Sequence, residues 1–520
     1  MSLTGKNIIG FASSSEGQVT LKAINPSTGE NLSTDFFKAT INELNSAVEK
    51  ADKAFQIYRK KSGQEKAAFL EKIAEEIETL GDTLTERYMA ESGLPQGRAV
   101  GERGRTIGQL KLFAQLLKDG SWVNARIDTA LPDRQPLPRN DIRSMERPLG
   151  AVGVFGASNF PLAFSVAGGD TASALAAGCC VVFKAHPAHL GTSELVGLAI
   201  QKAAIETNMP DGVFSLLFDD SFEIGQELVK HPSIKAIGFT GSYRGGKAIF
   251  DTAVARPEPI PVYAEMGSVN PVFVLPKIIQ EKSQSIAQNY VASVTLGVGQ
   301  FCTNPGMLLL EKNADFISAL ETQIQEANGG VMLTTGIKDA YRKGVEKSEN
   351  LSKVIGKGKT PSGFTAVEPV LFHADIDTLI ANPHLSEEIF GPTSIVVEGN
   401  SKDELLAVAK SLAGHLTATV FGNEEDLNEY QDLLEILQQK VGRLIINGFP
   451  TGVEVCHAMV HGGPFPSTTD SRSTSVGTGS ITRFTRPVCF QDFPDSLLPD
   501  ELKSGNPLNI WRLVNGQNEQ

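Results

Sequence analysis

Apolar residues in the first quarter of the chain recur at the spacing of amphipathic helices. The periodic runs extend from Val48 to Tyr58, from Phe69 to Leu80 just ahead of Gly81, and from Leu110 to Leu117. Within each run the apolar positions lie three or four residues apart, which places them on one face of a helix. The pattern therefore predicts that the N-terminal region opens with amphipathic helices.

Beyond residue 150 the pattern changes to short, continuous apolar runs. Residues 151–155, 181–183 and 236–239 read as buried strands, and helical patterns follow the second and third of them. A second series begins at residues 271–274 and continues with a strand at 306–310. Apolar runs without alternation are typical of strands that helices cover on both faces, and repeated strand–helix units indicate parallel sheets. The sequence predicts two successive α/β domains with mostly parallel sheets.

Length and composition fit a large multidomain protein. The 520 residues predict about three domains at roughly 150 residues each, and 41% hydrophobic residues are ample for buried cores. A net charge of −13 disfavours nucleic acid, whose binding demands clustered Lys and Arg. No run of about 18 uncharged apolar residues occurs, and residues 1–6 lack a basic stretch that leads into an apolar one. We expect a cytoplasmic protein with no membrane partner.

The cysteines do not form a disulfide or zinc-binding pattern. Five are present, at Cys179, Cys180, Cys302, Cys456 and Cys489, without C-x-x-C spacing. We therefore expect reduced thiols and no metal. Cys179 and Cys180 lie in an apolar stretch, where free cysteine packs as a small hydrophobic residue. Cys302 differs, because it lies in Gly299-Gln300-Phe301-Cys302, a glycine-containing turn that continues with polar residues.

Cys302 and Glu265 together predict acyl chemistry at a carbonyl group. A thiolate attacks the carbonyl carbon, and a carboxylate that activates water releases the acyl group. Glu265 follows an apolar stretch and precedes Met266-Gly267, a setting that should raise its pKa toward neutrality. Asn159 and the Cys302 backbone N–H can donate to an oxygen that gains negative charge. Asn159 can equally cap a helix that starts at Pro161.

Five motifs resemble those of the aldehyde dehydrogenase superfamily, in the family's order and at about its spacing. They are Asn159-Phe160-Pro161, Gly238-Phe239-Thr240-Gly241-Ser242, Glu265-Met266-Gly267, Gly299-Gln300-Phe301-Cys302 and Glu388-Ile389-Phe390-Gly391-Pro392. The resemblance extends from about residue 25 to about residue 493. It implies oxidation of an aldehyde to a carboxylate through a thiohemiacetal and a thioester on Cys302, with a hydride passing to a nicotinamide. Glu265 favours hydrolysis of the thioester over transfer to coenzyme A, since the acylating branch lacks this carboxylate.

The same resemblance implies the domain layout. An α/β fold with two lobes, mostly parallel sheets and a small β flap for oligomerisation is expected. Residues 1–125 and 148–266 would form the cofactor-binding domain and 267–475 the catalytic domain. Residues 126–147 and 476–520 would form the oligomerisation and bridging segments of a homodimer or homotetramer.

Cofactor residues are also implied by the resemblance, since the chain has no G-x-G-x-x-G run. Gly241 and Ser242 lie at a strand-to-helix junction, where backbone N–H groups can hold a pyrophosphate. Lys184 would reach the adenosine ribose, and Glu388 and Phe390 match the family pair that holds the nicotinamide ribose and ring.

NADP is the expected cofactor, with NAD as an alternative. Three positions past Lys184, NAD-preferring relatives often have a Glu that binds the ribose 2′-hydroxyl, whereas this chain has Pro187. Because Pro187 has no carboxylate, the 2′-phosphate of NADP would not be repelled at that position.

Departures from the family pattern favour one bacterial branch. Ser158 replaces a common Trp, residues 267–271 replace the usual Gly-Gly-Lys-Ser-Pro, and His461-Gly462-Gly463-Pro464-Phe465-Pro466 is present. The branch contains 2,5-dioxopentanoate dehydrogenases and an NADP-linked fatty aldehyde dehydrogenase. We therefore expect oxidation of 2,5-dioxopentanoate to 2-oxoglutarate, with fatty aldehyde oxidation as the alternative. In the fatty aldehyde enzyme a matching histidine lies near the thiol, so His461 is either an auxiliary base or a structural loop residue.

The two substrates make different demands on the site. A keto-acid semialdehyde carries a carboxylate that an arginine would hold, whereas a fatty aldehyde needs an apolar tunnel. Arg472 is the candidate for the first role, and Phe160 and Phe164 would line the entrance in either case.

The residues around Cys302 disfavour two other classes of protein. A catalytically silent structural protein on this fold is disfavoured because the thiol, amide and carboxylate are all present. A cofactor-free thiol hydrolase is disfavoured because the chain shows no Cys-His-Asn arrangement beyond His461.

Overall fold

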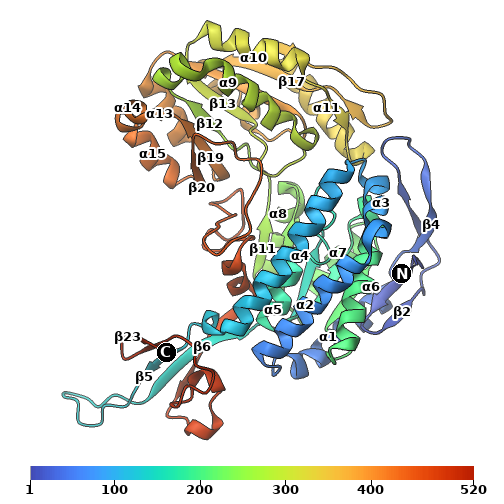
Figure 1. Cartoon of the computed structure of the whole chain (residues 1–520), viewed down its shortest axis with the longest axis vertical. Helices are drawn as coiled ribbons and strands as arrows, with labels where there is room; N and C mark the ends of the chain where they lie inside the picture. Colours follow the sequence, from blue (N-terminus) through green and yellow to red (C-terminus); the bar gives the residue numbers. More distant parts are fainter. Residues whose placement is uncertain (1) are drawn as a thin grey trace.

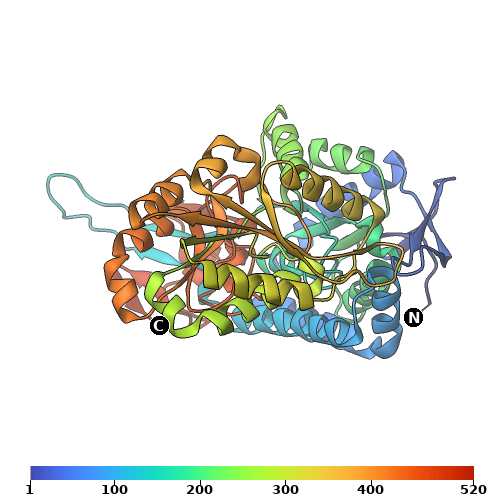
Figure 2. The ribbon, with the colours of Figure 1, turned by 90° about the horizontal axis from the view of Figure 1, so that it is seen from above.

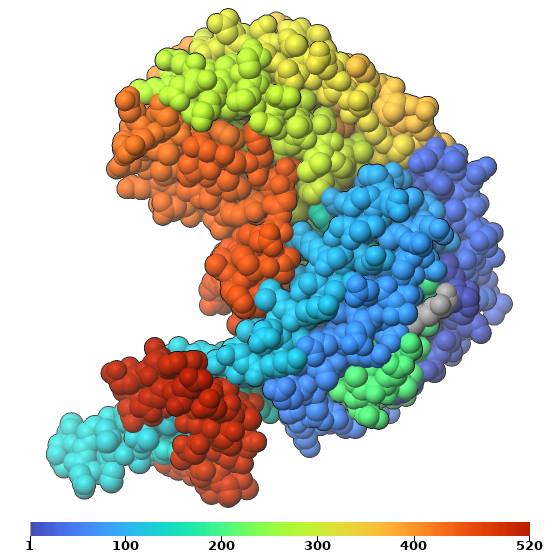
Figure 3. Space-filling model, viewed as in Figure 1, coloured from blue at the N-terminus to red at the C-terminus, as the bar shows by residue number. Residues whose placement is uncertain are grey.

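A computed structural model describes residues 2–520 as two α/β lobes and a projecting β-sheet arm (Figure 1). This confirms the predicted fold class. Seen from above, a hairpin of the arm extends well beyond the body of the molecule (Figure 2). The space-filling view shows a broad recess between the arm and the second lobe (Figure 3).

The first lobe is built on a seven-stranded sheet. In spatial order its strands are β11 (Val262–Glu265), β10 (Ile234–Thr240), β7 (Ala151–Phe155), β8 (Cys180–Lys184), β9 (Phe214–Leu217), β1 (Asn7–Ile9) and β2 (Ala12–Ser14). The first five are parallel, and β1 and β2 join the edge antiparallel. The predicted strands at 151–155, 181–183 and 236–239 are confirmed.

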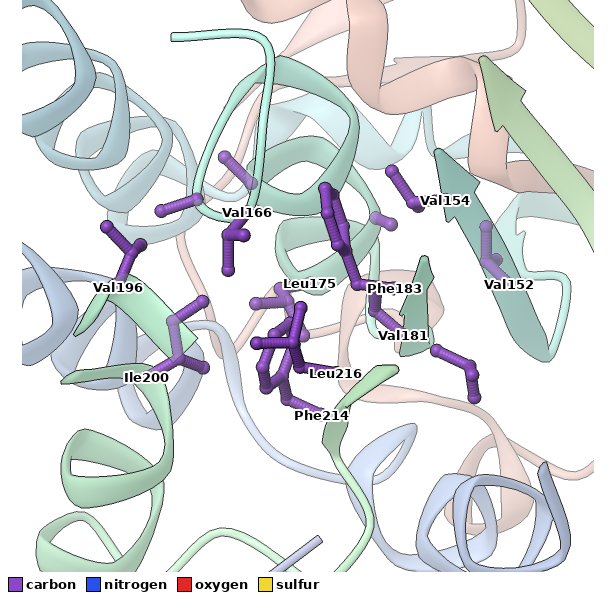
Figure 4. Close-up of a cluster of buried hydrophobic side chains, with 14 of the residues drawn as sticks. Val152, Val154, Val166, Leu175, Val181, Phe183, Val196, Ile200, Phe214 and Leu216 are labelled. Carbon is purple, nitrogen blue, oxygen red and sulfur yellow. The ribbon is translucent and has the colours of Figure 1, made fainter. Parts of the chain in front are cut away.

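Helices cover both faces of this sheet. They are α1 (Ile41–Tyr58), α2 (Gly63–Thr79), α3 (Gly81–Ser92), α4 (Gln96–Asp119), α5 (Gly169–Ala177), α6 (Leu190–Glu206), α7 (Glu223–Lys230) and α8 (Tyr243–Val254). Right-handed crossovers place α5 and α6 on one face and α7 and α8 on the other. Helix α1 packs with α7, while α2 and α4 pack on α5. In Figure 4, Phe183 and Leu216 of the strands gather with Leu175 and Ile200 of α5 and α6, and all four are buried.

Local sequence signals set several helix ends. Helix α1 begins after Thr40, whose hydroxyl accepts from the backbone N–H of Glu43 while the Glu43 carboxylate accepts from that of Thr40. Helix α2 begins with the same reciprocal pair between Ser62 and Glu65. Each capping box satisfies two backbone donors that the first helical turn leaves open.

The second lobe is built on another seven-stranded sheet. In spatial order its strands are β15 (Lys353–Lys357), β17 (Val370–Asp375), β18 (Thr393–Gly399), β13 (Met307–Glu311), β12 (Val272–Val274), β19 (His415–Phe421) and β20 (Val441–Ile446). Only β15 is antiparallel to its neighbour. The sheet separates two apolar clusters. Its helices are α9 (Pro276–Thr295), α10 (Ala314–Glu326), α11 (Thr335–Glu349), α12 (Ile376–Ala381), α13 (Lys402–Ser411), α14 (Glu424–Glu429) and α15 (Gln431–Gln438).

The arm joins two segments that are far apart in sequence. Its five-stranded sheet contains β21 (Thr485–Gln491), β6 (Ile142–Pro148), β5 (Arg126–Asp128), β22 (Arg512–Val514) and β23 (Gln517–Glu519). Several large apolar side chains of these segments are exposed, among them Leu137, Leu497 and Trp511. Exposed apolar patches often mark interfaces. The predicted homodimer or homotetramer stays a prediction, which sedimentation velocity would test.

Two features of the N-terminal region were predicted wrongly. The region opens with β1, β2, β3 (Thr20–Ile24) and β4 (Asn31–Phe37) before any helix. These strands are too short for a visible period, and β1 is specified by its pairing with the distant β9. Helix α3 was also missed, because it follows α2 across the single residue Leu80.

Two simpler expectations can be compared with the structure. Cys179 and Cys180 are fully buried, as predicted. Of the helices formed by residues 2–520, none combines the length and the apolar character that crossing a bilayer requires.

Candidate active site

The loop that carries Cys302 is held by a close approach between two backbones. Gly299 has φ +64°, and a Cβ atom on it would lie 2.2 Å from the carbonyl oxygen of Gly391. Only glycine fits at this position, because a side chain would clash there and the left-handed conformation disfavours other residues. The glycine of the Gly299-Gln300-Phe301-Cys302 motif is therefore a packing requirement set by the Glu388–Pro392 segment.

Asn270 fixes the other side of the same loop and was not identified from the sequence. Its side-chain Nδ2 donates to the carbonyl oxygens of Cys302 and Asn304, at 2.9 Å each, and its Oδ1 accepts from the Thr417 hydroxyl at 2.9 Å. Asn270 is 1% exposed and has φ +48°. The departure from the family pattern at residues 267–271 was visible in the sequence, but the role of the amide depends on loops that meet only in the fold.

Glu265 is the last residue of β11, and a returning segment lies against it. Thr468 forms an antiparallel bridge with Glu265, and the Met266 N–H donates to the Ser467 carbonyl at 2.7 Å. The Thr469 N–H donates to the Ala264 carbonyl at 3.1 Å. This segment follows β20 of the second lobe, so residues predicted to belong to one domain complete the sheet edge of the other.

The returning segment brings His461 between Glu265 and Cys302. His461 Nε2 lies 3.4 Å from Cys302 Sγ and 2.9 Å from Glu265 Oε1. Glu265 is 3% exposed and His461 is 1% exposed. The Ser475 hydroxyl donates to Glu265 Oε2 at 2.5 Å, and the sequence had not indicated it. The structure thus brings together three of the predicted catalytic residues, and their roles stay predictions.

The charges of this group determine the state of the thiol. Burial, followed by the Glu265 carboxylate, holds the pKa of Cys302 well above its usual value. The resting sulfur is therefore a thiol, and it becomes a nucleophile only when a base takes its proton.

The expectation that the site raises the pKa of Glu265 is wrong. Burial does oppose the charged form, but the neighbouring His461 and the hydrogen bonds from His461, Ser475 and Cys302 together hold the pKa of Glu265 below its usual value. Glu265 is consequently a carboxylate at neutral pH and can accept a proton without further adjustment.

Asn159 lies beside the thiol loop. Its Nδ2 donates to the carbonyl oxygen of Gln300 at 3.0 Å, and the residue is 8% exposed. The helix-capping alternative is wrong, because the residues after Pro161 form turns and the next helix begins at Gly169. The turn is held instead by the buried Glu102 carboxylate, which accepts from the backbone N–H groups of Leu162 and Ala163 at 2.8 and 3.0 Å.

The predicted phosphate-binding turn has two backbone donors already in use. Ser242 is the N-cap of α8, and its hydroxyl accepts from the Gly245 N–H at 3.2 Å. The Gly241 N–H donates to the Glu265 carbonyl at 3.0 Å, so this amide is not available to a phosphate. The helix terminus after Ser242 is exposed.

The other cofactor candidates lie at two places. Lys184 ends β8 at the carboxyl edge of the parallel sheet, and burial lowers its pKa. Glu388 and Phe390 line a cleft together with Ser268 and Gly299. The Glu388 side chain is exposed to solvent, yet desolvation of its carboxyl group by the surrounding protein raises the pKa of that group to about 8.

Aromatic side chains lie beside the catalytic group, and their expected place at the substrate entrance stays a prediction. The ring of Phe164 lies 6.2 Å from that of His461, and Phe160 packs edge-on against Phe301 at 5.4 Å. Arg472, the candidate for binding a substrate carboxylate, is wrong for that role. Its side chain is 92% exposed and faces Asp470 at 3.8 Å.

Comparison with known proteins agrees with this geometry. The sequence model described as "Aldehyde dehydrogenase family" matches residues 11–486. The chain belongs to the aldehyde dehydrogenase family. It is 51% identical to alpha-ketoglutaric semialdehyde dehydrogenase 2 of Azospirillum brasilense, over all of both chains. It is 48% identical to alpha-ketoglutaric semialdehyde dehydrogenase of Acinetobacter baylyi, over 98% of each.

Solved structures share the fold of this aldehyde dehydrogenase. A 1-pyrroline-5-carboxylate dehydrogenase from Thermus with bound NAD matches with a TM-score of 0.78 and 22% identity, over 94% of this chain and 92% of that one. The family uses NAD(P).

The catalytic group also has the donor types of a metal site. One ligand atom from each of Glu265, Cys302 and His461 lies within 4.8 Å of the others. Carboxylate, thiolate and imidazole are all zinc ligands. The prediction that the enzyme needs no metal therefore stays open to a chelation test.

Replacing Asn270 is expected to loosen the thiol loop. Asn270→Ala removes the amide that holds two loop carbonyls and leaves alanine at a positive φ, at a cost of about 2–4 kcal/mol of stability. We expect a lower Tm and a kcat that falls roughly tenfold or more, since misplaced reacting groups lose rate. Asn447→Ala is the control, because Asn447 also has positive φ but bonds Gly422. An equal loss of kcat in both variants would contradict the positioning role.

Neutralising Glu265 is expected to make the thiol more reactive. In the wild type the rate of alkylation by iodoacetamide should rise about tenfold per pH unit up to about pH 9, because the thiolate fraction grows that way below the thiol pKa. Glu265→Gln removes a negative charge that raises the pKa of Cys302. The variant should therefore be alkylated faster at about pH 8.5. Glu388→Gln removes a carboxylate with a weaker influence and should accelerate alkylation less. Slower alkylation of Glu265→Gln would show that the carboxylate activates the thiol.

Proposed function

We propose that this enzyme oxidises 2,5-dioxopentanoate to 2-oxoglutarate with NAD(P), through a thiohemiacetal and then a thioester on Cys302. The observation that carries the proposal is the buried contact between Cys302, His461 and Glu265, with Asn159 beside the same loop. The substrate is supported by the names of the two relatives that are 51% and 48% identical over essentially full length. Fatty aldehyde remains the competing substrate.

The first step is attack on the aldehyde carbon. His461 Nε2, at 3.4 Å from Cys302 Sγ, is placed to take the thiol proton. As the sulfur–carbon bond forms, the carbonyl oxygen gains negative charge. The Asn159 amide, which also donates to the Gln300 carbonyl at 3.0 Å, and the Cys302 backbone N–H are the candidate donors to this oxygen, and such donors each contribute roughly a hundredfold or more in rate.

The second step is loss of hydride and release of the acid. A nicotinamide held near Glu388 and Phe390 would supply the hydride acceptor, and Cys302 would then hold the acyl group as a thioester. Glu265 is ionised and lies beside the sulfur, so it can take a proton from the water that attacks the thioester. The proton that His461 took from the thiol must first pass to solvent, after which its Nε2, at 2.9 Å from Glu265, can share the proton taken from water.

The residues at the sheet edge fit a dinucleotide. Parallel α/β sheets bind nucleotides beyond the carboxyl ends of their strands. Lys184 and the exposed N-terminus of α8 both lie there, and they offer an ammonium and backbone donors to a negatively charged ligand. Glu388 and Phe390 line the cleft next to the thiol loop and would hold the nicotinamide end.

A substrate panel tests the proposal. The assay follows the formation of reduced nicotinamide. The kcat/KM for 2,5-dioxopentanoate should exceed the kcat/KM for a medium-chain fatty aldehyde by roughly a hundredfold or more, because a site that hydrogen-bonds a polar group of its substrate rejects substrates without that group. Cys302→Ala should lower the rate by roughly a thousandfold or more. A higher kcat/KM for the fatty aldehyde would favour the competing substrate. Ester hydrolysis without cofactor as the main activity would sink the dehydrogenase proposal, and chelator-treated enzyme should retain its rate.

We further propose that NADP is accepted and preferred. The residue three positions after Lys184 is Pro187, the first residue of a 3-10 turn, and it brings no negative charge to the ribose site. Pro187→Glu is therefore expected to lower kcat/KM for NADP relative to NAD by roughly tenfold or more, since a carboxylate repels the 2′-phosphate and accepts from a 2′-hydroxyl. An unchanged ratio, or a wild type that prefers NAD a hundredfold, would refute the assignment.

A further inference from the structure

We propose that Arg105 binds the carboxylate of the substrate and so determines that the enzyme prefers a semialdehyde acid over an uncharged aldehyde. The inference rests on the proposed function. The role expected of the exposed Arg472 is thus assigned to a residue of α4, which is separated from His461 by the ring of Phe164.

The guanidinium of Arg105 has unused hydrogen-bond donors. Its Nε and Nη2 are buried, and no protein atom of residues 2–520 accepts from them. A buried charged donor without an acceptor is costly, so such groups are rare unless they serve a ligand. The neighbouring acid Glu102 cannot serve, because its carboxylate is occupied by Tyr88, Arg98, Leu162 and Ala163.

A chain of contacts places Arg105 relative to the sulfur. Its Cζ lies 5.4 Å from the ring centre of Phe164, and that ring lies 6.2 Å from the ring of His461. His461 in turn lies 3.4 Å from Cys302. The positive charge of Arg105 acts on the thiol directly, since it opposes the rise in the pKa of Cys302.

The expected substrate is short, with an aldehyde at one end and a carboxylate at the other. A five-carbon chain spans about 5 Å from its first to its last carbon when extended. With the aldehyde carbon at Cys302, the carboxylate would lie among the side chains next to the thiol, and Arg105 is linked to the thiol through Phe164 and His461. A planar guanidinium with two free donors matches a carboxylate in a bidentate pair.

Arg98, two helical turns earlier on α4, shows what distinguishes Arg105. Arg98 also stacks on aromatic rings, at 4.3 Å from Phe160 and 4.6 Å from Phe301. Its Nε, however, lies 3.3 Å from Glu102 Oε2, so its charge is already paired. The two arginines therefore share a helix and a kind of packing, and only Arg105 has a guanidinium without a carboxylate.

Arg443 adds positive charge from the second lobe. This residue of β20 donates to the carbonyls of Pro450 and Gly452, at 2.7 and 3.1 Å, and its buried Nε has no acceptor within residues 2–520. Its charge also interacts with Cys302 when the sulfur is ionised. A carboxylate bound next to the thiol would thus meet positive charge from both lobes.

The test compares two aldehydes of equal length, 2,5-dioxopentanoate and pentanal, with the full-length enzyme. Arg105→Met removes the charge and keeps an apolar side chain against Phe164. We expect the ratio of kcat/KM for the acid to that for pentanal to fall roughly ten- to a hundredfold, chiefly through KM, because a charge-assisted pair is lost. Arg105→Lys should restore part of the ratio, since it keeps the charge but not the fork.

Controls separate this outcome from a structural role. Arg98→Met removes a stacked but paired arginine and should change both substrates in parallel, and Arg472→Ala should change neither. A parallel loss for both aldehydes in Arg105→Met would overturn the inference, as would an unchanged ratio. If Arg105→Met does not fold, the ratio measured for Arg105→Lys decides in the same way. A wild type that oxidises neither aldehyde, or only pentanal, instead refutes the proposed function.

Discussion

The pairing of residues 467–469 with the free edge of β11 is the interaction on which the rest of the site depends. A parallel edge strand leaves unpaired backbone groups, and this chain covers them with a segment that returns from the second lobe. The same hydrogen bonds carry His461 and Ser475 to the Glu265 carboxylate at the end of that strand. Sheet edge and catalytic chemistry are therefore built by one set of contacts.

The loop that carries Cys302 is held by two further contacts. Gly299 allows the loop to touch the backbone at Gly391, and Asn270 holds the carbonyls of Cys302 and Asn304. Both contacts bind backbone, so the sulfur position does not depend on the side chains that react. A covalent mechanism needs such rigidity, because misplacing a reacting atom by about 1 Å can lower the rate about a hundredfold.

Electrostatics then sets the order of events. Glu265 is stabilised as a carboxylate by His461 and Ser475, and burial together with the Glu265 charge keeps the sulfur protonated. The positive charge of Arg105 acts in the opposite direction on the pKa of Cys302. The balance of buried negative and positive groups explains how one pocket can hold a protonated thiol beside an ionised carboxylate.

Much of this protein was determined by the sequence alone. Continuous apolar runs at residues 151–155 and 181–183 predicted buried parallel strands, because a strand covered on both faces has no polar side to show. The motifs around Cys302 and Glu265 indicated acyl chemistry, since a thiol can attack a carbonyl carbon and a carboxylate can activate water. Tertiary structure decided what depends on contacts between distant segments. The pKa of Glu265, the place of His461, the amide of Asn270 and the unpaired charge of Arg105 all arise from side chains separated by tens to hundreds of residues. No local pattern records such neighbours, because burial and pairing are properties of the folded interior and not of the chain.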